Sequence, residues 1–131
     1  MNIHTGTDEL IIDFKGFEQI LVLKSRLVIK RSEIVTIKWH QLINLSRREL
    51  GWRIGGTAIP KVILAGRFAG LSGVNFVYLR HPHNIMALKS ARLNHVLEIE
   101  TREYRYKKLL LSLNDPELAI RLIEWSRGKV A

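Results

Sequence analysis

The chain has 131 residues, of which 47% are hydrophobic, a formal net charge of +9 and no cysteine. This composition excludes a disordered chain and predicts one folded domain over residues 1–131, with its core between about residues 10 and 127. The lack of cysteine excludes disulfides, thiolate zinc sites and a cysteine nucleophile, and it is typical of proteins in a reducing compartment.

Apolar and polar residues alternate along most of the chain with the two-residue period of half-buried β-strands. The segments with this pattern are residues 9–14, 19–31, 33–39, 74–80, 95–101 and 105–113. The side chains expected on their apolar faces are Leu10, Ile12, Phe14, Val35, Ile37, Trp39, Val74, Phe76, Tyr78, Leu97, Ile99, Leu109, Leu111 and Leu113. Tyr106, Lys108 and Ser112 are expected on the opposite face of the last segment. Residues 40–50 fit either a helical turn or an irregular strand.

Six of the nine glycines lie between Leu50 and Gly73, and such a density is one sign of a phosphate-binding loop. The segment does not match the nucleotide-binding patterns. No Gly-Lys-Ser/Thr occurs, and "GRFAGLSG" has the wrong spacing and precedes a strand rather than a helix. We therefore interpret these glycines as turns and bulges of a bent sheet, with Pro60 outside any central ladder.

Residues 114–129 predict one amphipathic helix of about three turns. Asn114 or Asp115 caps its start, Pro116 suits its first turn, and Gly128 follows its end. The apolar stripe is formed by Leu118, Ala119, Leu122, Ile123 and Trp125, and Arg121 and Arg127 point away from it. Many short strands followed by one helix predict a small β-barrel or strongly bent sheet that this helix closes at one end.

A turn and a helix start in this chain match motifs of a known family. The turn with Gly56, Thr57 and Pro60 precedes the strand "GRF" (residues 66–68), and the helix starts with "NDPE" at residues 114–117. Together with "FVYLR", "VLEIET" and "YKKLLLSL", these motifs resemble bacterial pleckstrin-homology-like domains over nearly the whole chain. Lys61 departs from the family pattern, in which glycine is common at this position.

The resemblance implies about seven antiparallel strands in two near-orthogonal sheets, capped by a C-terminal helix, and no catalytic activity. This fold agrees with the barrel and helix that the residue patterns predict. The family includes ring-like oligomers formed through edge contacts, and residues 74–80 carry no charge that blunts an edge before Arg80. We therefore expect a homo-oligomer that forms through edge strands.

Basic residues are concentrated in the middle third of the chain. No acidic residue occurs between Leu50 and Leu97, and Arg53, Lys61 and Arg67 lie in this span. A local excess of positive charge attracts anionic lipids, nucleic acids or acidic proteins, provided that the strand bends at the glycines bring these residues to one face. The alternative is a solubilising surface whose acidic partners are distant in sequence.

A second basic group lies at the ends of an expected early hairpin and consists of Lys15, Lys24 and Arg26. This pattern resembles the one that lipid-binding pleckstrin-homology domains use. Three cations suit a phosphorylated headgroup, because charge-assisted hydrogen bonds are strong. The alternative is edge protection, for which basic residues at hairpin ends are common.

Patterns for catalysis and metal binding are weak. Residues 81–83, His-Pro-His, supply too few ligands for a metal site, so a surface turn is the better interpretation. Glu98 and Glu100 share one strand face, and we expect them to be solvated near Arg105 or Lys107 rather than to act as catalytic acids. No serine nucleophile motif occurs. The sequence therefore predicts no enzyme, no cofactor and no metal.

The function predicted from these features is a noncatalytic interaction module that binds a protein partner or an anionic lipid surface. The alternative is a small nucleic-acid-binding β-barrel, which the charge fits but for which the aromatic residues are expected on apolar faces. The N-terminal residues lack the pattern of a signal peptide, and no apolar run has the length that spans a bilayer. We expect a cytoplasmic protein that can also lie at the inner face of the membrane.

Overall fold

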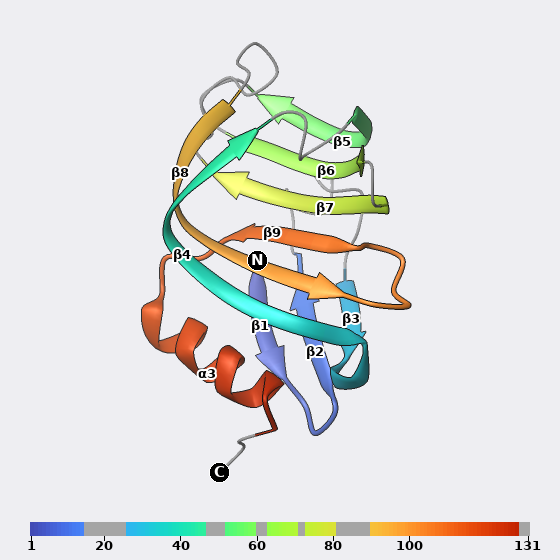
Figure 1. Cartoon of the computed structure of the whole chain (residues 1–131), viewed down its shortest axis with the longest axis vertical. Coiled ribbons are helices and arrows are strands. Elements are labelled where there is room, and N and C mark those ends of the chain that lie inside the picture. The colour runs from blue at the N-terminus through green and yellow to red at the C-terminus, as the bar shows by residue number, and fades with distance from the viewer. Residues whose placement is uncertain (15–25, 47–51, 60–62, 71–72, 81–89, 129–131) are drawn as a thin grey trace.

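The computed structural model describes residues 1–14, 26–46, 52–59, 63–70, 73–80 and 90–128. Within these residues the chain forms a three-stranded sheet, a six-stranded sheet and a C-terminal α-helix, α3 (Pro116–Ser126). Figure 1 shows the small sheet and α3 at one end of the molecule and the large sheet curving above them. The predicted mainly β fold with two sheets and a C-terminal helix is confirmed.

The small sheet consists of β1 (Asn2–Thr5), β2 (Glu9–Asp13) and β3 (Arg26–Lys30), which pair antiparallel in that order. Alternate residues face the core from these strands, namely Ile3, Leu10, Ile12, Leu27 and Ile29. The predicted apolar face of β2 is therefore confirmed. The sequence pattern does not predict β1, because Ile3 is its one apolar residue.

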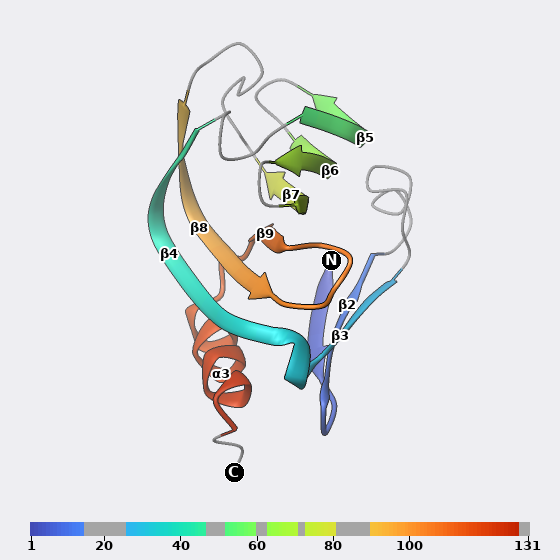
Figure 2. The same ribbon diagram turned by 45° about the vertical axis from the view of Figure 1, so that its right-hand side comes forward.

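The large sheet has the strand order β4-β8-β9-β7-β6-β5. Its strands are β4 (Ile34–Ser46), β5 (Trp52–Ile59), β6 (Ile63–Gly70), β7 (Gly73–Arg80), β8 (Ser90–Thr101) and β9 (Lys108–Ser112). A 3-10 turn, η1 (Arg31–Glu33), leads from β3 in the small sheet to β4. Figure 2 shows that β4 and β8 bend together, so the sheet curls from the small sheet towards β5, β6 and β7. Residues 40–46, ambiguous in the sequence, belong to β4.

One strand pairing differs from the antiparallel arrangement that the sequence predicts. β9 turns back from β8 and lies between β8 and β7, which run in opposite directions. A strand in that place is necessarily parallel to one neighbour, and β9 is parallel to β7. The insertion gives β7 a partner on each side, β9 and β6, so residues 74–80 are not the edge strand that the sequence predicts. Among the described strands, the sheet edges are β1, β3, β4 and β5.

A β-bulge near the start of β4 changes which of its side chains enter the core. The register of β4 against β8 shifts between Ile34 and Thr36, which leaves Val35 as an extra residue. Ile34 is consequently buried, and Val35 is 55% exposed. The predicted apolar position of Val35 is therefore wrong, because simple alternation does not continue across a bulge.

The hydrophobic core lies between the two sheets. Phe14, which follows β2, contacts Phe76 and Tyr78 of β7 with ring centroids 5.7 and 5.6 Å apart. The other predicted core residues of the large sheet that are buried here are Ile37, Leu97, Ile99, Leu109, Leu111 and Leu113. Tyr106 was expected on the opposite face but is buried in this core, 5.2 Å from the Phe76 ring, because it lies in the turn that precedes β9.

The centre of the large sheet is also buried on its other face. Val77, Leu79, Val96 and Leu110 alternate with the core-facing residues of β7, β8 and β9, and each is at most 3% exposed. Strands that are covered on both faces have nearly continuous apolar runs instead of alternating ones. This burial explains the run "FVYL" in β7.

The glycine-rich segment contributes β5, β6 and the start of β7. The register of β5 against β6 shifts between Arg53 and Gly55, which confirms a bulge at one of the predicted glycine positions. Gly73 has a φ of 141°, which strongly favours glycine, and an added Cβ would also crowd the Lys107 Cβ at 3.2 Å. Pro60 lies outside the described residues.

Candidate binding groove between β1 and α3

A groove of about 300 Å³ separates β1 from α3. Its lining consists of Ile3, His4 and Thr5 from β1 and Leu118, Arg121 and Leu122 from α3. The two leucines and Ile3 are buried or half-buried and form an apolar floor, whereas the other three residues are exposed at the rim. In both ribbon views α3 lies beside β1, on the side away from β2 (Figures 1 and 2).

The helix wall of this groove is fixed at both ends. At the start, Asp115 accepts a hydrogen bond from the Leu118 N–H at 3.1 Å, and Pro116 occupies the first turn, which confirms the predicted cap. Near the end, Trp125 Nε1 donates to the Gly6 carbonyl oxygen at 3.1 Å. Because Gly6 belongs to the β1–β2 turn, α3 is attached to the same hairpin that supplies the opposite wall.

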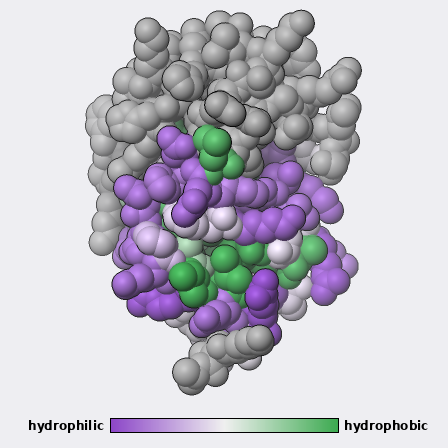
Figure 3. Space-filling model, turned by 60° about the vertical axis from the view of Figure 1, so that its left-hand side comes forward, coloured by the Kyte–Doolittle hydropathy of each residue, from purple (hydrophilic) through white to green (hydrophobic). Residues whose placement is uncertain are grey.

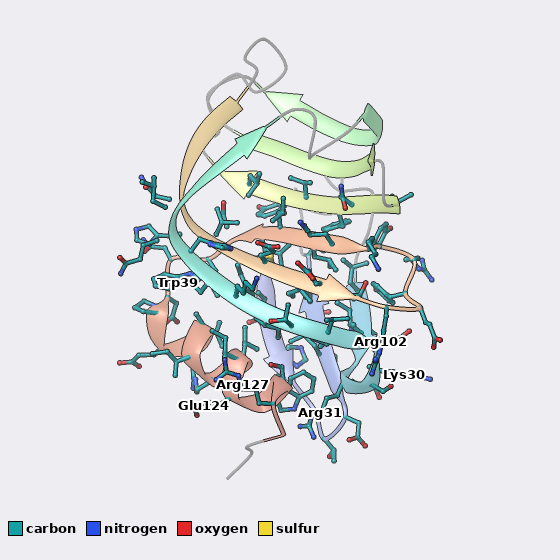
Figure 4. All side chains as sticks on the ribbon, in the orientation of Figure 1. Lys30, Arg31, Trp39, Arg102, Glu124 and Arg127 are labelled. Carbon is teal, nitrogen blue, oxygen red and sulfur yellow. The ribbon has the colours of Figure 1, made fainter. Side chains whose placement is uncertain are left out.

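Arg31 of η1 supports the same end of the helix. Its Cζ lies 4.6 Å from the ring centroid of Trp125, which is a cation–π contact. Figure 4 shows Arg31 at the C-terminal end of α3, whereas Lys30 and Arg102 lie farther from the helix. Arg102 joins η1 through its backbone, whose N–H donates to the Glu33 carbonyl at 2.8 Å. Arg31 and Arg102 therefore help to hold the corner between the two sheets.

The β1 edge of the groove directs unpaired backbone groups towards α3. Gly6 N–H donates to the Glu9 carbonyl at 2.8 Å and closes the β1–β2 hairpin. Gly6 and Glu9 thus form a hydrogen-bonded pair, and hydrogen-bonded and non-hydrogen-bonded pairs alternate along an antiparallel ladder. His4 is therefore hydrogen-bonded to β2, whereas Ile3 and Thr5 point their N–H and C=O groups away from β2. Within the described part of the chain, no backbone hydrogen bond outside the β1–β2 ladder involves Ile3 or Thr5.

His4 is held at the groove by an ionic cluster on the outer face of the small sheet. Its Nε2 donates to Asp13 Oδ2 at 3.0 Å, and Arg26 Nε donates to Asp13 Oδ1 at 2.6 Å. The hydrogen bond from His4, followed by that from Arg26, lowers the pKa of Asp13 below its ordinary value of 3.8. Both carboxylate oxygens are thus engaged, and the side chain of His4 is oriented by Asp13.

This cluster predicts a pH dependence of folding stability. Because the pKa of Asp13 is lower in the folded protein, the stability that it contributes is present above its ordinary pKa and is lost as the pH falls through the folded value. Urea unfolding of the wild type and Asp13→Asn should show a less stable variant at about pH 7 and a shrinking difference below about pH 4. A difference that grows on acidification would contradict the assignment.

Most of the six basic residues that the sequence assigns to anion binding have no described side chain. Of these six side chains the structure describes that of Arg26, which is 58% exposed and donates a hydrogen bond to Asp13. Arg53 and Arg67 lie on the neighbouring strands β5 and β6, with Arg67 opposite Gly55 in the register. Lys15, Lys24, Lys61 and residues 81–83 lie outside the described residues. The expected headgroup site therefore stays a prediction.

Glu98, one of the two carboxyl groups considered as catalytic acids, has different neighbours from those predicted. Glu98 is buried rather than solvated, and it accepts a hydrogen bond from His40 Nε2 at 2.8 Å. Lys108 Nζ lies 3.4 Å from its other oxygen, so its partners are not Arg105 or Lys107. Burial raises the pKa of Glu98, but His40 and Lys108 outweigh burial and lower it. These three side chains satisfy one another across β4, β8 and β9.

Several exposed hydrophobic side chains lie on the face formed by α3 and β4. Figure 3 shows hydrophobic side chains among hydrophilic ones on this face. The exposed apolar residues of these two elements are Ile120, at 55%, and Val35 and Leu42, at 55% and 52%. Single exposed apolar residues are common in soluble domains. The groove differs because it combines an apolar floor with directed backbone donors and acceptors.

Sequence reasoning missed the β1 wall of the groove and misjudged part of the helix wall. Arg121 does point away from the buried stripe, as predicted, but it lies at the groove rim rather than in open surface. The missed signal for β1 was the turn "TGTD" between Ile3 and Leu10, since Gly and Asp favour turns between strands.

Comparison of the chain with protein-family models, curated proteins and solved structures finds no match. The fold and the groove therefore define its class: a mainly β domain whose edge strand β1 lies beside a C-terminal helix. In the described ranges, no helix has the length and apolar character needed to cross a membrane.

Proposed function

We propose that this chain is a noncatalytic interaction module that binds an extended segment of a partner protein along the groove between β1 and α3. The observation that carries the proposal is the orientation of Ile3 and Thr5, whose N–H and C=O groups face away from β2 beside an apolar floor. Addition of a strand to a sheet edge uses such groups for affinity and neighbouring pockets for specificity.

The expected affinity is modest. Two residues with outward groups form about four backbone hydrogen bonds, each worth about 0.5 to 1.5 kcal/mol net. Burial of apolar side chains against Leu118 and Leu122 adds to this, and ordering of the extended segment subtracts from it. The balance corresponds to dissociation constants between about millimolar and micromolar, which suits a reversible module.

A protein partner is favoured over an anionic lipid headgroup as the ligand. The described member of the basic group in the early hairpin, Arg26, shares its charge with Asp13. A lipid headgroup at Arg26 would therefore compete with an ion pair that is already formed. The groove requires no such rearrangement. The resemblance to pleckstrin-homology-like domains supports an interaction module in general, and a cytoplasmic location remains our expectation.

The proposal is tested by Thr5→Pro. Proline removes the outward N–H of Thr5 without removing a hydrogen bond to β2, and edge strands tolerate proline when the missing N–H faces outward. Peptides of about 12 residues, selected from a random phage library on the wild-type protein, serve as the probe. We expect Thr5→Pro to weaken the selected peptides by about tenfold or more, measured by fluorescence anisotropy.

Thr5→Val is the matched control because it changes the side chain but keeps the N–H. It should bind the selected peptides within about twofold of the wild type, and the circular dichroism spectra of all three proteins should agree. If Thr5→Val lost as much peptide affinity as Thr5→Pro, or if the selection yielded no peptide, strand pairing at β1 would be contradicted.

A further inference from the structure

We infer that the segment bound at β1 carries an acidic side chain that pairs with Arg121. This inference rests on the proposed function and specifies the chemistry of the partner. It predicts selectivity for one kind of extended segment, which backbone pairing alone does not provide. The observations that carry it are the Arg121 guanidinium at the groove rim and the absence of an acid among the six lining residues.

Arg121 is the cationic side chain of the groove lining. It is exposed on α3 and lines the groove, and no ion pair joins it to another described side chain. Glu117 and Glu124 precede and follow it on the helix, yet neither lies within ion-pair distance of its guanidinium. A guanidinium without a carboxylate partner at a groove rim is suited to a bidentate contact with a carboxylate from another molecule.

The β1 wall of the groove contributes no charge that opposes this contact. His4 Nε2 donates to Asp13, so in the neutral ring Nδ1 is an acceptor and does not itself pair with a carboxylate. Asp13, the acid nearest to this wall, has one oxygen on His4 and the other on Arg26. Its charge is therefore largely offset and does not repel an acidic segment from the groove.

A second copy of the chain fits the same edge less well. An antiparallel pairing of two β1 strands about a two-fold axis at His4 places Ile3 opposite Thr5 of the other copy and satisfies the outward groups. Such a pair brings together two molecules that each carry a net charge of +9, which opposes association. An acidic segment of another protein meets no such repulsion.

The alternation of side chains along a strand gives the expected sequence pattern. On a strand added beside β1, every second side chain faces α3. When an acidic residue faces Arg121, the residues two positions away on the same face lie towards Leu118 and Leu122, which form the apolar floor. The expected motif is therefore an acidic residue with apolar residues two positions before or after it.

The test is a charge reversal, carried out with one peptide selected on the wild-type protein and synthesised with Glu, Gln or Lys at its acidic position. The wild type should bind the Glu peptide about fivefold more tightly than the Lys peptide, and Arg121→Glu should reverse this order. Thr5→Pro should weaken all three peptides, which separates a failure of edge pairing from a failure of the acidic preference.

Arg105→Glu is the matched control, because it changes the net charge equally at an exposed position in the β8–β9 turn. It should keep the wild-type order of the three peptides. An equal loss of acidic preference in Arg105→Glu and Arg121→Glu would assign the preference to overall charge and overturn the inference. Selected peptides that depend on Thr5 but carry no acidic residue would overturn it and leave the proposed function standing. A dimer that Thr5→Pro dissociates, measured by light scattering, would identify a second copy as the occupant instead.

Discussion

Replacement of Trp125 by alanine is expected to lower the free energy of unfolding by about 3 to 5 kcal/mol, because it empties a large buried site under α3. The indole is 5% exposed, and its Nε1 donates to Gly6 of the β1–β2 turn. The Arg31 guanidinium also loses the ring on which it stacks. Urea unfolding followed by circular dichroism measures the change, and the groove should lose peptide binding in parallel.

Trp125→Phe separates the contributions of the ring and its N–H. It keeps most of the apolar volume but leaves the Gly6 carbonyl without its donor, so the expected loss is about 1 to 2 kcal/mol. If Trp125→Ala unfolded at the wild-type urea concentration, α3 would not cover the core in solution. The helix wall of the groove would then not exist in the form described.

Replacement of Phe76 by alanine should be about as severe, with a loss of about 3 to 5 kcal/mol. Phe76 is fully buried in β7, and its ring contacts Phe14 at 5.7 Å and Tyr106 at 5.2 Å between centroids. These rings connect the small sheet to the large one, and aromatic pairs add about 0.5 to 1.5 kcal/mol each beyond simple burial. Chemical denaturation measures the loss.

Val35→Ala is the matched control for Phe76→Ala because it also removes an apolar side chain from the large sheet. Val35 is 55% exposed at the bulge of β4, so the expected change lies within about 0.5 kcal/mol. If Val35→Ala lowered the free energy of unfolding strongly and Phe76→Ala only slightly, β4 would lack the bulge described, and Val35 would face the core.

The sequence by itself determined the features that depend on neighbours along the chain. The alternation of Leu10, Ile12 and Phe14 predicts a buried strand face, because successive side chains of a strand point to opposite sides. Asp115 and Pro116 predict the start of α3, because the first backbone N–H groups of a helix need a cap. Such signals depend on residues that are close in sequence, so they do not depend on how distant segments pack.

The tertiary structure decided the features that depend on contacts between distant segments. The insertion of β9 between β7 and β8 made one pairing parallel and removed the predicted edge, and no residue of β7 signals it. The partners of Glu98 come from β4 and β9, so its burial does not follow from its own strand.

The groove belongs to this second kind of feature. Its walls come from opposite ends of the chain, and the packing of α3 on the core, with Trp125 bonded to Gly6, brings β1 and α3 side by side. The short strand "NIHT" has a single apolar residue, too weak a pattern to predict β1 from the sequence. The direction of its free N–H and C=O groups depends on which pairs of the β1–β2 hairpin are hydrogen-bonded. That register is a property of two paired strands, and a one-dimensional pattern of residues does not contain it.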